Sequence, residues 1–140
     1  KINRKIKYRD FWMPFTPSLT IKQSELFLKN PNKIFSPYMT IAFDLKEDVS
    51  ERIPAAIHPA DKTSRPQMVL EKDNPRYYQI LKEFGKITGI ECLLNTSFNL
   101  HGEAIVETPE QAIQTFLDSE IDILIFDSVA ISRVKLDKIQ

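Results

Sequence analysis

The densest run of polar residues in this sequence is NTSFNLHGE, residues 95–103, which directly follows the apolar run 90–94. If residues 90–94 form an interior strand, the polar run lies at the strand's carboxyl end, where open sheets usually bind ligands. Short amide and hydroxyl side chains there can hold a phosphate or a planar amide group without adding charge. They can equally satisfy the backbone of a tight loop, so the residues alone leave both interpretations open. The side chains concerned are Asn95, Thr96, Ser97 and Asn99.

Lys7 and Arg9 form a second candidate site near the start of the chain. If residues 5–9 are extended, the two cationic side chains project from the same face. A lysine supplies a point charge and an arginine supplies a planar fork, and this pairing suits a polyphosphate. The basic segment 1–9 is also typical of a solvated edge strand or arm, in which these charges bind nothing.

A predicted turn, residues 58–67 with the sequence HPADKTSRPQ, supplies the third candidate. Arg65 could contact an anion from this turn, or the turn could simply be solvated. His58 and His101 could hold a metal together with Asp61 or Glu103. No metal-ligand spacing supports such a site, which favours structural histidines.

The remaining rare residues indicate packing rather than chemistry. Cys92 is the single cysteine, so it forms no disulfide within the chain, and its apolar neighbours predict a buried, unreactive thiol. Phe11, Trp12 and Phe15 could stack on a base, although packing in a core or an interface is the favoured interpretation. Three glycines cannot make a glycine-rich phosphate loop, so side chains would have to hold any phosphate.

Strands and helices must position these candidates, and their signals intermix along the chain. Residues 38–45 alternate between apolar and polar side chains, which predicts a strand. This mixture predicts an α/β or α+β domain with a mixed sheet and flanking helices. The other expected strands are residues 53–57, 67–71, 90–94, 121–126 and 129–135, the last two joined by a turn at Asp127 and Ser128.

Three helices are expected. The first covers residues 24–29 and is stopped by Asn30 and Pro31. Asn74 caps a second helix that runs to Gly89, and a capping box at Thr108 begins a third. The apolar side chains expected to face inward are Ile80, Leu81, Phe84 and Ile87 in the second helix and Ala112, Ile113, Phe116 and Leu117 in the third.

The composition excludes several classes of protein. A chain of 140 residues with 42% hydrophobic and 27% charged residues predicts one soluble globular domain. Nineteen basic and 19 acidic residues cancel, so no long-range field draws the molecule to nucleic acid or anionic lipid. No apolar run reaches the length of a membrane span, and the opening residues lack a signal-peptide core. We therefore expect a cytoplasmic protein.

Four segments together carry a family resemblance: KINRKIKYRDFWMPFTPS, YMT, IPAAIHPADKTSRPQ and NPRYYQILKEFGKITGIECLLNTSFNLHGEAIVETPEQAI. In this order they resemble the C-terminal region of the NodU/CmcH carbamoyltransferase family, from Ile2 to about Phe126. The NTSFN-x-HGE-x-IV element is specific, whereas a K-x-R element alone would be weak. The resemblance implies that residues 1–140 are a single YrdC-like domain. The absence of an initiating methionine supports the expectation of a fragment of a longer chain.

The resemblance implies a reaction that begins with carbamoyl phosphate and ATP. Carbamate released in the site attacks the α-phosphate of ATP and gives carbamoyl-adenylate and pyrophosphate. An N-terminal sugar-kinase-like domain would then pass the carbamoyl group to a hydroxyl-bearing small-molecule acceptor. Mg²⁺ would accompany ATP, and any transition metal would lie in that other domain.

The resemblance also assigns residues. The K-x-R and S-x-N elements of YrdC-like domains are matched by Lys7-Tyr8-Arg9 and Ser97-Phe98-Asn99. Lys7 and Arg9 are expected to neutralise phosphate charge, while Ser97 and Asn99 hold the carbamoyl group or an α-phosphate oxygen. Further substrate or nucleotide contacts are expected from Arg4, His58, Arg65, Asn95 and Thr96.

The sequence departs from the family pattern in one turn. Many relatives read H-x-D-G-T-A-R-P-Q, whereas this chain has one extra residue after His58 and a lysine, Lys62, in place of the glycine. The turn conformation and the role of His58 therefore stay open. Two other functions also remain: a nucleotide- or RNA-binding module of the same fold without turnover, and a structural domain that docks onto a larger chain.

Overall fold

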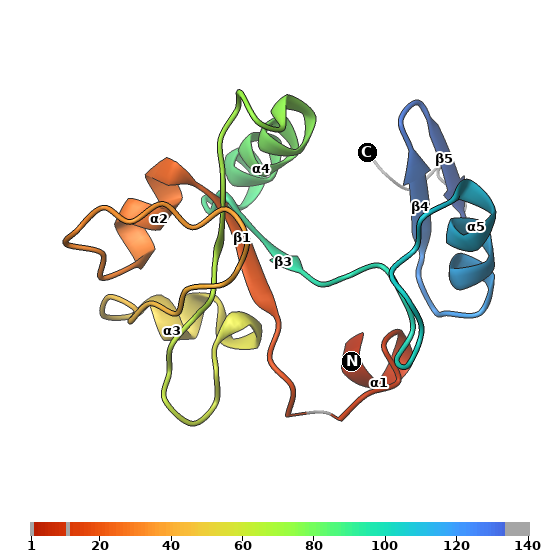
Figure 1. Ribbon diagram of the computed structural model, residues 1–140. Helices are drawn as coiled ribbons and strands as arrows, with labels where there is room; N and C mark the ends of the chain where they lie inside the picture. Colours follow the sequence, from red (N-terminus) through yellow and green to blue (C-terminus); the bar gives the residue numbers. More distant parts are fainter. Residues whose placement is uncertain (1, 11, 134–140) are drawn as a thin grey trace. The chain divides into compact units, whose positions relative to one another are not determined.

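The computed structural model describes residues 2–10 and 12–133. The chain forms two compact units: residues 14–96, which we call the sheet unit, and residues 1–13 with 97–140, which we call the hairpin unit. Each unit contains helices and strands, so the expected mixed α+β class is confirmed (Figure 1). Within the described residues, no helix is both long and apolar enough to cross a membrane.

The sheet unit is organised by a mixed three-stranded sheet. β1 runs parallel to β2 and antiparallel to β3, so Leu19 lies opposite Met68 on one side and Cys92 on the other. The strand expected at 67–71 is confirmed over its first three residues. β3 overlaps the strand expected at 90–94 but lies at the edge of the sheet, so the expectation of an interior strand is wrong. The strands are β1 (Thr16–Thr20), β2 (Gln67–Val69) and β3 (Cys92–Asn95), in the order β2-β1-β3.

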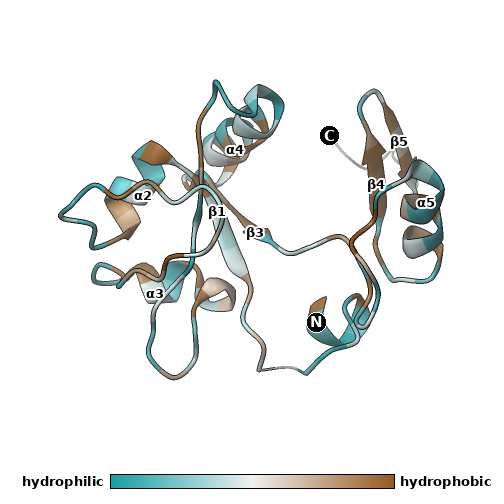
Figure 2. Cartoon of the chain, in the orientation of Figure 1, coloured by the Kyte–Doolittle hydropathy of each residue, from teal (hydrophilic) through white to brown (hydrophobic). Residues whose placement is uncertain are grey.

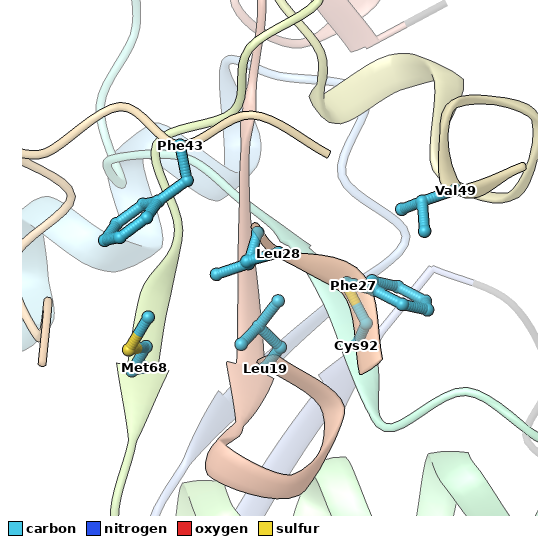
Figure 3. Close-up of a cluster of buried hydrophobic side chains, with 7 residues drawn as sticks. All are labelled: Leu19, Phe27, Leu28, Phe43, Val49, Met68 and Cys92. Carbon is cyan, nitrogen blue, oxygen red and sulfur yellow. The ribbon is translucent and has the colours of Figure 1, made fainter. Parts of the chain in front are cut away.

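The core of the sheet unit combines side chains from its strands with those of helices α2 (Ile21–Phe27) and α3 (Val49–Arg52). α2 begins three residues before the predicted helix because Thr20 Oγ1 accepts a hydrogen bond from Gln23 N and caps it. The buried cluster, drawn in Figure 3, consists of Leu19, Phe27, Leu28, Phe43, Val49, Met68 and Cys92.

Helix α4 (Pro75–Thr88) confirms the predicted second helix. Asn74 caps its first turn by accepting a hydrogen bond from Tyr77 N, and Gly89 ends it in the left-handed conformation, with φ of 77°. Leu81 is fully buried, as predicted. The other three residues expected to face inward are exposed: Ile80, Phe84 and Ile87. The helix therefore packs through a narrower stripe than its apolar periodicity predicts.

Two expected strands are wrong. Residues 38–45 form only isolated bridges, in which Phe43 pairs with Ser64 and Leu45 with Leu28. Met39 has φ of 59°, which an extended strand does not contain. The strand expected at 53–57 is instead a 3-10 helix, Pro54–Ala56. Proline favours the first turn of a helix and cannot donate to a strand ladder.

The hairpin unit has a small core of its own. The predicted capping box is confirmed, because Thr108 and Gln111 each accept a hydrogen bond from the other's backbone N–H. The buried residues of this core are Ala112, Phe116 and Leu124, whereas Ile113 and Leu117, which were expected to face inward, are exposed. The elements are α1 (Ile2–Lys5), α5 (Pro109–Leu117), β4 (Ile123–Phe126) and β5 (Val129–Ser132).

β4 and β5 form the predicted C-terminal hairpin, and their ribbon is mostly apolar in Figure 2. Both strands are shorter than the predicted runs 121–126 and 129–135. Residues 134 and 135 of the second run lie outside the described residues. The turn at Asp127 and Ser128 is confirmed, with Asp127 in the left-handed region at φ of 36°.

Candidate functional site

The segment that carries Lys7 and Arg9 begins as the helix α1 and does not form an extended arm. Lys7 N donates to Ile2 O and Arg9 N donates to Asn3 O, both at 3.0 Å. Tyr8 lies between them in the left-handed conformation, with φ of 49°. The expectation that Lys7 and Arg9 project from one face of a strand is therefore wrong, because the backbone turns at Tyr8.

The Lys7 ammonium is buried against the loop 97–99, and only 4% of the residue is exposed. Nζ lies 2.8 Å from Ser97 O and 2.7 Å from Asn99 O. It also lies 2.6 Å from Asn99 Oδ1 and 3.3 Å from Ser97 Oγ. Four oxygen acceptors thus surround three ammonium protons. The interpretation of Lys7 as a solvated charge is wrong, and the lysine ties the loop together.

The loop after β3 is fixed further by its own side chains. Ser97 Oγ donates to Asn99 Oδ1 at 2.6 Å, and Asn99 Nδ2 donates to Glu103 O at 2.8 Å. His101 N donates to Lys7 O at 3.2 Å, which joins the two segments through the backbone as well. The interpretation that these polar groups satisfy a tight loop is therefore confirmed, and the same groups also gather oxygen acceptors around the Lys7 ammonium.

Burial and a neighbouring charge both act on the cations of this cluster. Burial lowers the pKa of Lys7, and the charge of Arg9 lowers that pKa further. Burial also lowers the pKa of Arg9, whose Nε donates to Asn3 Oδ1 at 2.8 Å. An anion bound near both groups would relieve their repulsion and favour the charged lysine. Arg4, the third expected cation of this segment, is exposed on α1.

Arg65 and His58 line a pocket of about 380 Å³ within the sheet unit. His58 Nδ1 lies 3.2 Å from Asp61 Oδ1. The same carboxylate oxygen accepts hydrogen bonds from Thr63 N at 2.9 Å and Thr63 Oγ1 at 2.8 Å, and these bonds lower the pKa of Asp61. His58 therefore has a structural partner in this turn, while Arg65 is exposed and available to an anion in the pocket.

Lys62, for which the resemblance implies a glycine, adopts the left-handed conformation with φ of 61°. Glycine reaches that conformation without steric cost, whereas a Cβ makes it unfavourable. The turn therefore has a backbone shape suited to glycine and accommodates lysine with some strain.

Asn95 has a structural place in the sheet unit. Its Nδ2 donates to Gln67 Oε1 at 2.9 Å, and Ser18 Oγ donates to the same oxygen at 2.6 Å. These bonds join side chains of β3, β2 and β1. Thr96 follows β3 and is exposed. Of the expected site residues, the structure thus brings Lys7, Ser97 and Asn99 into contact, and places Arg65 with His58 at one pocket.

Sequence reasoning missed two residues that shape the Lys7 cluster. Asn3 is buried and bridges Arg9 Nε to Met13 O, to which its Nδ2 donates at 2.8 Å. Glu103 accepts from Asn99 through its backbone and from Leu100 N through its carboxylate, at 3.3 Å. Glu103 belongs to the specific NTSFN-x-HGE element, which gave a signal for it, whereas no sequence signal marked Asn3.

The other rare side chains carry no chemistry of this kind. Among residues 2–10 and 12–133, no group of three or more His, Cys, Asp and Glu side chains could hold a metal ion. Cys92 is buried, as predicted, and burial raises its pKa to about 12. Trp12 is exposed and Phe15 is half-buried, while Phe11 lies outside the described residues.

Comparison with known proteins gives a consistent set of similarities. The sequence matches the family described as Carbamoyltransferase C-terminus over residues 1–133. An uncharacterised protein of Methanocaldococcus jannaschii is 44% identical over 95% of this chain and 21% of its own length. Nodulation protein NolO of Bradyrhizobium diazoefficiens is 35% identical over 89% of this chain and 23% of its own length. Nodulation protein U of Sinorhizobium fredii is 28% identical over 78% of this chain and 19% of its own length. The chain thus spans about a fifth to a quarter of the length of these curated relatives.

Proposed function

The chain belongs to the carbamoyltransferase C-terminal family, and on that premise we propose that it forms carbamoyl-adenylate from carbamoyl phosphate and ATP. Water first releases phosphate from carbamoyl phosphate and leaves carbamate in the site. A carbamate oxygen then attacks the α-phosphorus of ATP, the bond from this phosphorus to the β-bridging oxygen breaks, and pyrophosphate leaves. The observation that carries the proposal is the contact of Lys7 Nζ with Ser97 and Asn99, because it joins the K-x-R and S-x-N elements.

Lys7 and Arg9 act on the phosphates in this proposal. Their charges stabilise the five-coordinate α-phosphate and the departing pyrophosphate. Phosphoryl transfer depends chiefly on positioning and charge stabilisation, so it needs no nucleophilic side chain. With four acceptors around three protons, the Lys7 ammonium can exchange one protein oxygen for a phosphate oxygen. Ser97 Oγ and Asn99 Oδ1, the side-chain oxygens that now face Lys7, accept hydrogen bonds from the amino group of the planar carbamoyl group.

The remaining expected residues take supporting roles. Arg65 gives an additional anion contact at its pocket, which His58 also borders. Arg4 and Thr96 are exposed and make weaker contacts to substrate or nucleotide, while Asn95 acts by holding β3. Mg²⁺ enters with ATP. The triphosphate and water would supply most of its ligands, as is usual for nucleotide-bound Mg²⁺.

We place this chemistry in a longer cytoplasmic enzyme, of which residues 1–140 form a single YrdC-like C-terminal domain. An N-terminal sugar-kinase-like domain takes the adenylate and transfers the carbamoyl group to a hydroxyl-bearing small molecule. Any transition metal lies in that domain. The greater length of the relatives, of which this chain matches 21% to 23%, supports the proposal of a further domain.

Pyrophosphate release that depends on carbamoyl phosphate tests the proposal. We expect this chain to bind ATP weakly, to release pyrophosphate only when carbamoyl phosphate is present, and to lose that release in Lys7→Met. Lys72→Met, at an exposed lysine of the sheet unit, is the matched control and should behave as the original chain does.

Other outcomes identify the alternatives. Nucleotide affinity without pyrophosphate release, in both this chain and the longer protein, would indicate a binding module. Neither affinity nor release would indicate a structural domain. Robust carbamoyl transfer to a hydroxyl acceptor by this chain alone would show that the transfer step is wrongly assigned to an N-terminal domain.

A further inference from the structure

A pocket of about 740 Å³ lies in the sheet unit, and no residue assigned to the proposed reaction lines it. It is formed by α2, by the loop 30–35 and by residues at the end of β2. Its volume falls within the range of about 300–1,000 Å³ that is usual for small-molecule sites. The pocket is therefore large enough for a ligand of its own.

The lining of this pocket is mainly apolar. Leu28 and Met68 line it and are otherwise buried in the core. Ile34 and Phe35 also line it and remain 43% and 42% exposed. Two large apolar side chains thus face solvent beside buried apolar side chains, which gives a ligand's hydrocarbon part a surface to cover.

The loop that carries Ile34 and Phe35 is held in place by hydrogen bonds. Asn30 Nδ2 donates to Ile34 O at 2.8 Å, and Ile34 N donates to Asn30 Oδ1 at 2.9 Å. Ser36 O accepts from Met68 N at 2.8 Å, which ties the end of the loop to β2. The apolar wall is therefore preformed, and a ligand would not have to order it.

Lysines dominate the rim of the pocket. Lys29, Lys33 and Lys46 line it together with one carboxylate, Glu25. Lys46 Nζ donates to Glu25 O at 2.5 Å. Within the part of the chain that the structure describes, the side chains of Lys29 and Lys33 have no hydrogen bond or ion pair. The rim thus has an excess of positive charge and two cations able to accept a new partner.

We propose that this pocket binds a small amphiphilic anion, an alkyl or aryl carboxylate. Its apolar part covers Leu28, Ile34 and Phe35, and its charged head contacts Lys29 or Lys33. The charge of the rim selects an anion over a cation, and the apolar lining selects hydrocarbon over a purely polar metabolite. The site is independent of carbamoyl-adenylate formation.

Fluorescence titration of this chain with anilinonaphthalene sulfonate, an aryl anion, tests the proposal. We expect saturable enhancement that decanoate displaces and that decyltrimethylammonium, which has a similar alkyl chain but a positive head, does not. The double variant Ile34→Asn with Phe35→Ser should weaken binding by about tenfold or more, because it removes apolar contact area. Lys29→Gln with Lys33→Gln should weaken decanoate binding by about two- to fivefold while leaving decanol binding unchanged.

The matched controls are Ile87→Asn on α4, where the side chain is 85% exposed, and Lys72→Gln. Circular dichroism melts should show that all variants fold, since every substituted side chain is exposed or half-exposed. Displacement by the cationic amphiphile, or unchanged binding in the apolar double variant, would overturn the proposal. It would also be overturned if the longer protein failed to bind the probe, because another part of that protein would then cover the groove.

Discussion

Lys7 and Arg65 are both proposed to contact an anionic substrate, yet the surroundings of the two cations differ. The Lys7 ammonium is buried and contacts four oxygens of the loop 97–99. The Arg65 guanidinium is exposed at its pocket and makes no hydrogen bond or ion pair with the described residues. We therefore expect a substitution of Lys7 to lower both the stability of the hairpin unit and the proposed affinity for anions. We expect a substitution of Arg65 to lower the proposed affinity alone.

Lys7→Met carries the largest expected effect. It leaves the backbone oxygens of Ser97 and Asn99 without the Lys7 donor, while Asn99 Oδ1 keeps its hydrogen bond from Ser97 Oγ. We therefore expect the free energy of unfolding to fall by about 2 kcal/mol. ATP affinity should fall by about tenfold or more because a charge-assisted contact is also lost. Urea unfolding followed by the fluorescence of Trp12, the single tryptophan, and calorimetric titration with ATP measure the two effects.

The control for Lys7→Met is Lys5→Met, which removes an exposed ion pair between Lys5 and Glu120 in the same unit. That variant should lose little stability, because exposed pairs contribute little. If the Lys7→Met protein were as stable as the original chain but deficient in ATP binding, the ammonium would bind the ligand without stabilising the loop 97–99.

Ser97→Ala and Asn99→Ala carry the next largest effects. A side chain that faced only a ligand would have no internal partner, but Ser97 Oγ and Asn99 Oδ1 both contact Lys7. We therefore expect each variant to lose about 1 kcal/mol of stability and, in the longer enzyme, about 10²-fold in turnover. Melting curves and carbamoyl-phosphate-dependent pyrophosphate release on the same preparations measure both losses.

A double variant separates structure from catalysis at this cluster. The stability losses of Ser97→Ala and Lys7→Met should be less than additive, because the two residues share a hydrogen bond. Ser50→Ala, at an exposed serine of α3, is the control and should add independently. Variants that are less stable but fully active per folded molecule would restrict Ser97 and Asn99 to a structural role.

Raising the pH into the alkaline range should change the stability contributions of Cys92 and Lys7 in opposite directions. Burial raises the pKa of Cys92 from 9.0 to about 12, so between these values the unfolded thiol has lost a proton that the folded thiol keeps. The free energy of unfolding then falls with pH, by at most about 1.4 kcal/mol per pH unit. The pKa of Lys7 is lowered from 10.5, so Lys7 loses its proton at a lower pH in the folded state than in the unfolded state. The contribution of Lys7 to the free energy of unfolding therefore rises as the pH approaches 10.5.

Unfolding of the original chain, Cys92→Ala and Lys7→Met at about pH 8 and about pH 10 checks both signs. The stability of the original chain relative to Cys92→Ala should decrease at the higher pH, and its stability relative to Lys7→Met should increase. A change of the same sign in both comparisons would contradict this assignment of the two pKa shifts.

Local signals predicted the parts of the fold that local interactions determine. Thr108 and Gln111 satisfy each other's backbone groups within one turn, and Gly89 accepts the left-handed conformation that ends α4. The alternation in residues 38–45 failed as a signal because sheet pairing depends on partners elsewhere. Those residues pair only at isolated bridges, and Met39 has a positive φ.

The site shows the same division between local and distant determinants. Lys7 and Asn99 are 92 positions apart, so no spacing in the sequence predicts their contact. The resemblance to YrdC-like domains assigned both residues to one expected site, through the K-x-R and S-x-N elements, but it did not predict their direct contact. The geometry of Lys7 and Arg9 was predicted wrongly, since the helix α1 and the left-handed Tyr8 replace the expected extended segment. Asn3 escaped notice because its importance depends on Arg9 and Met13 being brought to it by that helix.

Arg65→Gln gives the smallest effect on stability and so isolates binding. Its exposed guanidinium has no partner among the described residues, and we expect unfolding free energy to change by less than about 0.5 kcal/mol. Affinity for carbamoyl phosphate should fall by about three- to tenfold, since a charge-assisted contact is lost. Titration calorimetry with carbamoyl phosphate measures this loss.

The matched control is Lys62→Gln, in the same turn but outside the lining of this pocket, and it is titrated in the same way. Equal affinities in Arg65→Gln and Lys62→Gln would remove Arg65 from the site and leave the Lys7 cluster to bind the anion.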